Sequence, residues 1–96
     1  MELEDISIAW EENGEEVIKE EDKYILSKGA WSTVAYLFRQ KDKTGEFGEK
    51  RVRLIRYKKR NGKYLTHTKF NLTGPSQVFQ LMEKLGEWYK DEEKKV

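Results

Sequence analysis

The chain of 96 residues is long enough for one domain and, at this size, buries only about 60% of its unfolded surface, so a second copy would help its small core. It has no cysteine, which excludes disulfide scaffolds, thiolate zinc sites and cysteine nucleophiles and favours a reducing, cytoplasmic location. The net charge of +1 hides an uneven distribution: residues 1–22 carry −9, residues 23–70 carry +11 and residues 71–96 carry −1.

The acidic first segment, residues 1–22, lacks the basic start and the apolar stretch of a secretory signal, and no run in the chain approaches the roughly 20 apolar residues of a membrane span. Within it, Ile6–Trp10 alternates apolar and polar residues, and Asn13-Gly14 is a hairpin signal. The pattern leaves open whether the segment is an edge hairpin or a loose arm. Its acids belong either to a solvated arm or to a phosphate mimic that lies on the chain's own basic surface.

Four strands are predicted between residues 23 and 72, where β-branched and aromatic residues are frequent and turn residues separate the runs. The turns fall at Gly29, at residues 41–48 and at Asn61-Gly62, where both residues tolerate positive φ and predict a type I′ hairpin. The predicted strands are 23–27, 31–40, 50–59 and 63–72.

One amphipathic helix is predicted after the last strand, beginning near Pro75, because proline is favoured in the first turn. Its apolar residues recur at three- and four-residue spacing and form one stripe: Val78, Leu81, Met82, Leu85 and Trp88. The fold class is therefore α+β, with a four-stranded antiparallel sheet, an additional hairpin left open, and the C-terminal helix packed on one sheet face. The predicted organisation is an acidic arm or edge hairpin over 1–22, a β-β-β-β-α module over 23–90 and a frayed tail over 91–96.

The two-residue turn predicts which residues share a sheet face. Paired positions across it sum to 123, which places Ile55 and Tyr57 with Phe70 and Leu72 on the apolar face, expected beneath the helix. The opposite face then carries a group of basic residues and the histidine: Arg56, Lys58, His67 and Lys69. If the numbers of paired residues on the strands 31–40 and 50–59 sum to about 90, Tyr36 and Phe38 lie on this open face as well.

Exposed aromatic rings among cations are suited to single-stranded nucleic acid, because rings stack on bases while cations neutralise phosphates. The predicted binding residues are Tyr36, Phe38, Arg56, Lys58, His67 and Lys69, with Trp31, Arg51 and Arg53 as second choices. Simpler roles stay open: a solvated edge that resists aggregation, a core or dimer-interface role for Tyr36 and Phe38, a packed Trp31, and an ordinary strand position for His67. A protein-interaction module that uses the same face is the alternative function.

The order and spacing of these elements resemble the β-β-β-β-α modules of single-stranded-DNA-binding transcriptional regulators: Pur repeats, positive cofactor four and Whirly proteins. "YILSKGAWSTVAYLFRQ" resembles the first two strands of bacterial Pur-type repeats, and "GKYLTHTKFNLTGPSQVFQLMEKL" resembles their final strand and helix. The resemblance covers residues 23–89. It implies a homodimer that binds single-stranded DNA or RNA on its sheet with little sequence preference, as a regulatory or DNA-maintenance accessory.

Catalytic signatures are missing from the sequence. It has no glycine-rich phosphate loop, no Gly-x-Ser-x-Gly elbow and no His, Cys or Asp cluster with metal-ligand spacing. The expectation is a non-enzymatic protein without a metal or small-molecule cofactor and without a membrane association.

Overall fold

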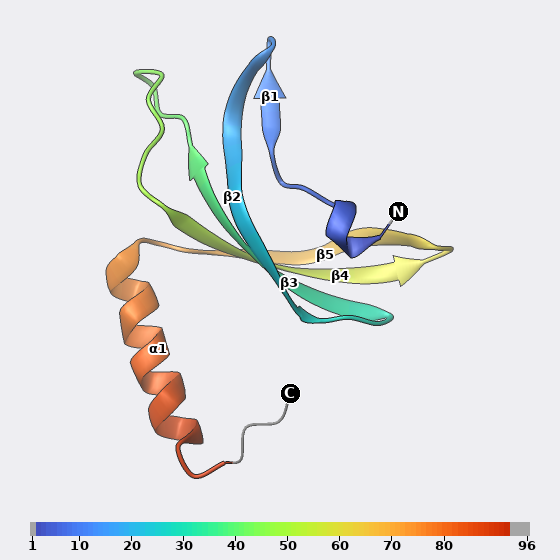
Figure 1. Cartoon of the computed structure of the whole chain (residues 1–96), viewed down its shortest axis with the longest axis vertical. Coiled ribbons are helices and arrows are strands. Elements are labelled where there is room, and N and C mark those ends of the chain that lie inside the picture. The colour runs from blue at the N-terminus through green and yellow to red at the C-terminus, as the bar shows by residue number, and fades with distance from the viewer. Residues whose placement is uncertain (1, 93–96) are drawn as a thin grey trace.

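The computed structural model describes residues 2–92, which form one five-stranded antiparallel sheet followed by a helix (Figure 1). The strands are neighbours in chain order, so every connection joins adjacent antiparallel strands; the one between β3 and β4 spans residues 41–50, and the others are two or three residues long. The predicted α+β class is confirmed, and the additional hairpin left open by the sequence is present. The elements are a 3-10 turn at Leu3–Asp5, β1 Trp10–Glu12, β2 Glu15–Ser27, β3 Trp31–Gln40, β4 Arg51–Arg60, β5 Lys63–Leu72 and α1 Pro75–Tyr89.

Both Asn-Gly pairs form tight turns: Asn61-Gly62, where the sequence predicted one, and Asn13-Gly14, where the sequence left open a hairpin or a loose arm. Asn13 and Asn61 have φ of 52°, and the glycines that follow have φ of 80° and 76°. Positive φ at both central residues is the requirement of a type I′ turn, whose twist matches that of the flanking strands. The predicted domain boundary at residues 22 and 23 falls within β2, and residues 93–96 of the predicted tail lie outside the described residues.

Irregular pairing curls the sheet. Register shifts occur once between β1 and β2, twice between β2 and β3 and once between β4 and β5. An extra residue in one strand bends it and increases the local twist. The sheet therefore has a concave side, called the inner face below, and an opposite outer face (Figure 1).

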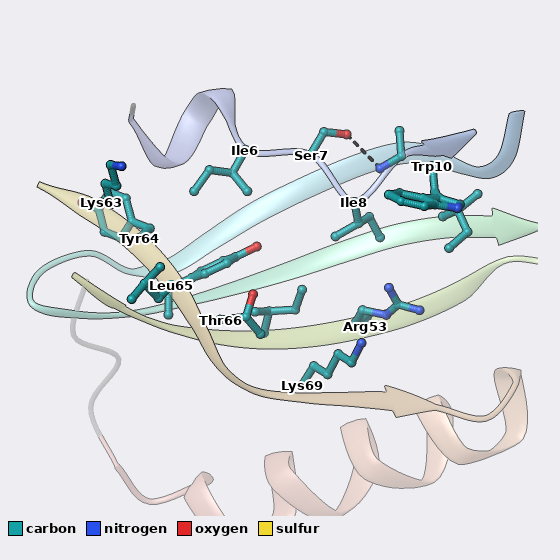
Figure 2. A pocket seen from close by; sticks show the side chains of 14 residues that line it. Ile6, Ser7, Ile8, Trp10, Arg53, Lys63, Tyr64, Leu65, Thr66 and Lys69 are labelled. Carbon is teal, nitrogen blue, oxygen red and sulfur yellow. Dashed lines mark hydrogen bonds between the residues drawn. The ribbon is translucent and has the colours of Figure 1, made fainter. Parts of the chain in front are cut away.

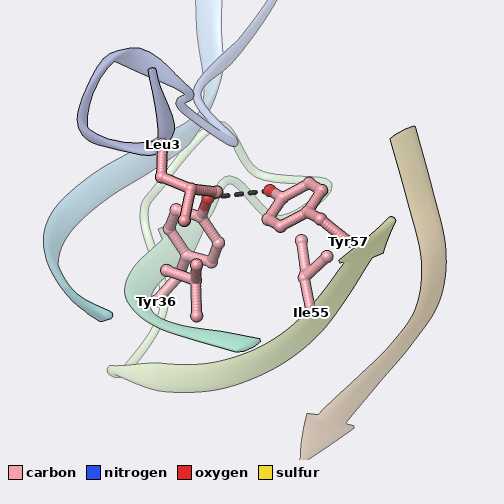
Figure 3. Packing of buried hydrophobic residues seen from close by; sticks show 5 residues of the cluster. Leu3, Tyr36, Ile55 and Tyr57 are labelled. Atoms are coloured by element: carbon pink, nitrogen blue, oxygen red, sulfur yellow. Dashed lines mark hydrogen bonds between the residues drawn. The ribbon is translucent and has the colours of Figure 1, made fainter. Parts of the chain in front are cut away.

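The hydrophobic core lies on the inner face, between the sheet and the N-terminal segment. Leu3 is fully buried there and packs with four strand residues, among them Tyr36 and Tyr57, whose hydroxyl oxygens are 2.7 Å apart (Figure 3). Ile6 and Ile8 are partly buried and pack against the same cluster. Residues 2–9, called the strap below, thus form the second layer that a one-sheet protein needs to bury one face.

Two side chains of β2 tie the strap to the sheet. The Lys23 ammonium donates hydrogen bonds to the carbonyl oxygens of Leu3, Glu4 and Ile6 at 3.0, 2.6 and 2.6 Å. The Glu20 carboxylate accepts hydrogen bonds from the Ser7 hydroxyl at 2.9 Å and from the Ile8 amide at 3.1 Å. These contacts satisfy backbone groups of a segment that has no strand partner of its own.

The predicted packing of the helix on a sheet face is not found. Helix α1 leaves the end of β5 and projects away from the sheet (Figure 1), and none of its residues is buried. The Cα radius of gyration is 15.5 Å, against about 13 Å for a compact domain of this length. The strap occupies the role that the sequence pattern assigned to the helix.

We expect Lys23→Met to destabilise the fold by about 1.5–3 kcal/mol, because hydrogen bonds from a charged donor contribute that much and three carbonyls lose theirs. Denaturant unfolding followed by circular dichroism measures the change. Lys28→Met is the control, since the Lys28 ammonium is exposed and pairs only with exposed carboxylates, and it should leave the unfolding midpoint nearly unchanged. An unchanged unfolding midpoint in Lys23→Met would show that the strap is not anchored by Lys23.

Candidate functional site

Tyr36 and Phe38 are fully buried on the inner face, so the prediction that they lie on an open face is wrong. The numbers of paired residues on β3 and β4 sum to 89, as in Val34↔Ile55. The prediction from the sequence used a sum of about 90. A shift of one residue moves every side chain of a strand to the other face. Tyr36 therefore lies with Tyr57 in the core, and the Arg53 guanidinium carbon is 4.6 Å from the centre of the Phe38 ring.

A β-bulge in β5 separates the predicted cations. The pairing sum is 123 from Arg60↔Lys63 to Tyr57↔Thr66, as predicted, and becomes 124 from Arg56↔Thr68 onward. Beyond the bulge the faces exchange, so Lys69 lies on the inner face and Phe70 on the outer face with 61% of its surface exposed. The predictions that Phe70 belongs to the core and that Lys69 lies beside Arg56 are both wrong.

Four of the nine predicted site residues do come together on the outer face. They are called the Trp31 cluster below: Trp31, Arg56, Lys58 and His67. The Arg56 guanidinium carbon and the Lys58 ammonium nitrogen lie 4.3 and 4.2 Å from the centre of the Trp31 ring. The His67 ring meets Trp31 edge to face, with ring centres 4.8 Å apart and an interplanar angle of 88°.

Strand pairing and the bulge together assemble this cluster. Trp31 on β3 is paired with Lys58 on β4, and Thr33 on β3 is paired with Arg56 on β4. Both cations of β4 therefore lie next to the indole on the neighbouring strand. His67 is the extra residue of the bulge, and bulges re-aim side chains in this way. Trp31 remains 37% exposed, and a hollow of about 380 Å³ beside it is lined by Trp31, Lys58, Arg60, Leu65, Thr66 and His67.

The positive charge of the cluster is not neutralised by the acidic segment. Among residues 2–92, none of the ion pairs involves Arg56 or Lys58. Glu15 and Glu21 pair instead with Lys41 and Arg39, at 3.6 and 2.9 Å. The idea that the acidic run lies on the basic face as a phosphate mimic has no support in these contacts.

The other three predicted residues lie on the inner face. Arg51 is paired with Phe38, and Arg53 donates a hydrogen bond to the Asn71 side-chain oxygen at 2.8 Å. Arg53 and Lys69 line a second, larger hollow of about 710 Å³ between the strap and strands β4 and β5 (Figure 2). Sequence reasoning missed this hollow, because no local signal in Ile6–Trp10 says which surface that segment crosses.

The buried phenols Tyr36 and Tyr57 have the most perturbed environment in the described part of the chain. Burial raises the pKa of Tyr36 well above its usual 10.0, and the hydrogen bond to Tyr57 adds to the rise. Burial also raises the pKa of Tyr57, although there the hydrogen bond from its partner opposes the effect. Both groups are therefore kept neutral, which suits a structural pair in an apolar layer.

No candidate metal centre is found in residues 2–92. No three His, Cys, Asp or Glu side chains in this range gather closely enough to hold a metal ion. No helix within the same range is long and apolar enough to cross a membrane. The Trp31 cluster and the larger hollow beneath the strap both combine cations with apolar lining.

Comparison with known proteins gives no relative on which to base an assignment. No protein-family model, no curated protein and no solved structure matches the chain.

We expect stability to fall in alkaline solution because of the two buried phenols. Their folded-state pKa values lie above 10.0, the value in the unfolded chain, so their contribution is complete below about pH 10 and is lost as the pH rises beyond it. Urea unfolding at about pH 8 and about pH 11 measures the loss. The double variant Tyr36→Phe/Tyr57→Phe should lose less stability between the two pH values than the natural chain, and an equal loss would contradict the assignment.

Proposed function

We propose that the protein binds single-stranded DNA or RNA, with little sequence preference, through the Trp31 cluster. The observation that carries the proposal is the exposed indole flanked by two cations that have no carboxylate partner among residues 2–92. Aromatic stacking contributes roughly 1–3 kcal/mol per base and tolerates any base, since every base has a π-face. Cations beside the ring add phosphate neutralisation, which is also independent of sequence.

Each residue of the cluster has a distinct role in this proposal. The Arg56 guanidinium lies over the indole, and a planar guanidinium is itself a platform on which a base stacks. Lys58 and the nearby Arg60 hold phosphates. His67 supports the indole from its edge and offers a ring nitrogen to a base or a phosphate.

A single strand fits this surface better than a duplex does. Readers of duplex DNA commonly place a helix in the major groove. Helix α1 carries Glu83 and Glu87 and has one described lysine, Lys84, within its span, so it lacks the positive face that a duplex reader needs. The basic and aromatic residues lie instead on strands, where unstacked bases are accessible.

The proposed activity is binding, without catalysis or a cofactor. A module of this kind would act as a cytoplasmic accessory in transcription regulation or DNA maintenance, as the resemblance to single-stranded-DNA-binding regulators implies. The alternative is that the same basic face binds an acidic protein, and the experiment below separates the two.

A labelled oligo-dT titration at two salt concentrations tests the proposal. We expect the affinity to fall as salt rises, because each phosphate contact releases counterions. Trp31→Ala should weaken binding by about 5- to 150-fold, which corresponds to the loss of one stacked base. Anisotropy of the labelled strand is the measurement.

The pair Arg56→Glu and Arg51→Glu locates the binding face. Both residues are on β4 and both side chains are exposed, but Arg56 faces outward and Arg51 inward, so the change in net charge is the same. Arg56→Glu should weaken binding and reduce its salt dependence, while Arg51→Glu should have a much smaller effect. The reverse order would place the strand on the inner face, and salt-independent or undetectable binding by the natural chain would favour the protein-interaction alternative.

A further inference from the structure

The hollow beneath the strap is a space that the chain itself leaves unfilled. It measures about 710 Å³ and lies between Ile6–Trp10 on one side and strands β4 and β5 on the other (Figure 2). Protein interiors are closely packed, so a gap of this size between two layers is unusual. Its volume falls within the range of about 300–1,000 Å³ that is typical of small-molecule sites. The hollow therefore has the size of a site for a small ligand.

Aliphatic and aromatic side chains form most of the walls of this hollow. The strap and β2 supply isoleucines on one side, and β4 and β5 supply the opposite wall. The apolar lining residues are Ile6, Ile8, Ala9, Trp10, Ile18, Ile55, Tyr57, Tyr64 and Leu65. Alternate residues of a strand share a face, so Arg53, Ile55 and Tyr57 form a line of about 14 Å along β4. The walls therefore suit an elongated apolar body.

One end of the hollow carries two cations. Arg53 on β4 and Lys69 on β5 extend into it from neighbouring strands (Figure 2). Lys69 is paired with Ile55, two positions from Arg53, so both charged side chains lie on the inner face. Lys63 is a third cation of the lining, and none of the described lining residues is acidic. The lining is therefore positive, although residues 1–22 carry −9.

The carboxylates of the strap have partners elsewhere. Glu2 and Glu4 both pair with Lys28, at 3.7 and 3.0 Å. Among residues 2–92, none of the ion pairs involves Arg53 or Lys69. A charge that is partly removed from water, as on the half-buried Arg53, is costly unless an opposite charge compensates it. This end of the hollow therefore favours an anion.

Arg53 is held in one position that leaves its terminal nitrogens available. Its Nε donates a hydrogen bond to the Asn71 side-chain oxygen at 2.8 Å, and its guanidinium carbon is 4.6 Å from the centre of the Phe38 ring. Within residues 2–92, no side-chain hydrogen bond uses the two terminal nitrogens of Arg53. A carboxylate can accept two parallel hydrogen bonds from such a fork. Because the fork is already oriented, binding orders little that was mobile before.

We propose that the hollow binds a small carboxylate with an elongated apolar body, of the size of a medium-chain fatty acid. The carboxylate accepts hydrogen bonds from Arg53 and from the Lys69 ammonium, and the apolar body lies between the isoleucines of the strap and Ile55. A purely polar anion would leave the apolar walls in contact with water, and an uncharged hydrocarbon would leave the cations unpaired. The inference concerns the inner face, goes beyond nucleic-acid binding and does not depend on it.

Titration with octanoate, followed by NMR of the indole N–H groups, tests the proposal and locates the ligand. The three tryptophans lie on different surfaces: Trp10 lines the hollow, Trp31 lies in the outer cluster and Trp88 lies on α1. Octanoate should shift the Trp10 signal to saturation and leave the other two nearly unchanged. A shift confined to Trp31 or Trp88, or no saturable shift, would overturn the proposal.

Two further probes test both halves of the ligand in the same titration. Acetate has the charge without the apolar body, and 1-octanol has the apolar body without the charge. Each should bind about 10-fold or more weakly than octanoate, because each leaves one part of the lining without a partner. Binding of 1-octanol as tight as that of octanoate would contradict the role assigned to the cations.

Substitutions at the cationic end give a second test. Arg53→Met should weaken octanoate binding by about 10- to 150-fold, the loss expected for hydrogen bonds to a charged group. Arg51→Met is the control, because Arg51 lies on the same strand and the same face but does not line the hollow. Equal dissociation constants for these two variants would overturn the proposal.

A charge reversal at Lys69 keeps the test decisive if Arg53→Met fails to fold. Lys69 is exposed, so Lys69→Glu should leave the fold intact while it places a carboxylate where the ligand carboxylate binds. We expect octanoate binding to weaken by about 10-fold or more, because like charges repel. Arg51→Glu makes the same change in net charge outside the hollow and should leave the affinity nearly unchanged. An unaltered affinity in Lys69→Glu would exclude this end of the hollow as the carboxylate site.

Competition with oligo-dT separates this site from the proposed nucleic-acid site. The two ligands occupy opposite faces of the sheet, so saturating octanoate should leave the anisotropy titration of labelled oligo-dT unchanged. Failure of oligo-dT to bind would contradict the function proposed for the Trp31 cluster and leave the octanoate result intact. Displacement of oligo-dT by octanoate would place the nucleic acid in the hollow and would overturn the proposal of a separate ligand site.

Discussion

The ammonium group of Lys23 is the contact on which the inner layer of this small protein depends. A single curled sheet buries one face only if something lies on that face, and the eight-residue strap does so without pairing as a strand. Its backbone carbonyls need donors, and one lysine side chain supplies three of them. Because the strap closes the core, the helix is not needed there and remains available for another contact.

Local signals in the sequence predicted the elements well, because turns and periodicity are local properties. The Asn61-Gly62 turn, the strands at 31–40 and 63–72 and the helix start at Pro75 are all confirmed. The choice of face was not predictable in the same way. The ten-residue connection between β3 and β4 does not constrain register, and a difference of one in the pairing sum reversed Tyr36 and Phe38.

The same physical reason explains which part of the candidate site could be foreseen. Register is secure next to a two-residue turn, so Arg56 and Lys58 were placed correctly on the outer face. The register changes beyond a bulge, and no feature of residues 66–68 in the sequence indicates that a bulge is present. Lys69 was therefore assigned to the wrong face. Trp31 was a second choice by sequence and is the centre of the cluster, because its partner across the sheet is Lys58. The hollow beneath the strap depends on a long-range contact that no local pattern encodes.

The outer face divides into a basic, aromatic end at the Trp31 cluster and an apolar end, where strand pairing aligns Tyr24, Ala35, Leu54 and Phe70. The charged end keeps its cations accessible, whereas the apolar end offers nothing to an anion. This division separates the exposed cations from the apolar residues on one face of a thin sheet.

The single inserted residue at His67 has a consequence for how this chain tolerates changes in length. Removing His67 would restore an unbroken ladder, and residues 68–72 would keep their present partners on β4, so Phe70 would stay on the outer face and Lys69 on the inner face. With His67 kept and the ladder unbroken, the same residues would be displaced by one position and their side chains would exchange faces. The extra residue at His67 therefore sets which side chains of the last third of β5 face the strap and which face away from it.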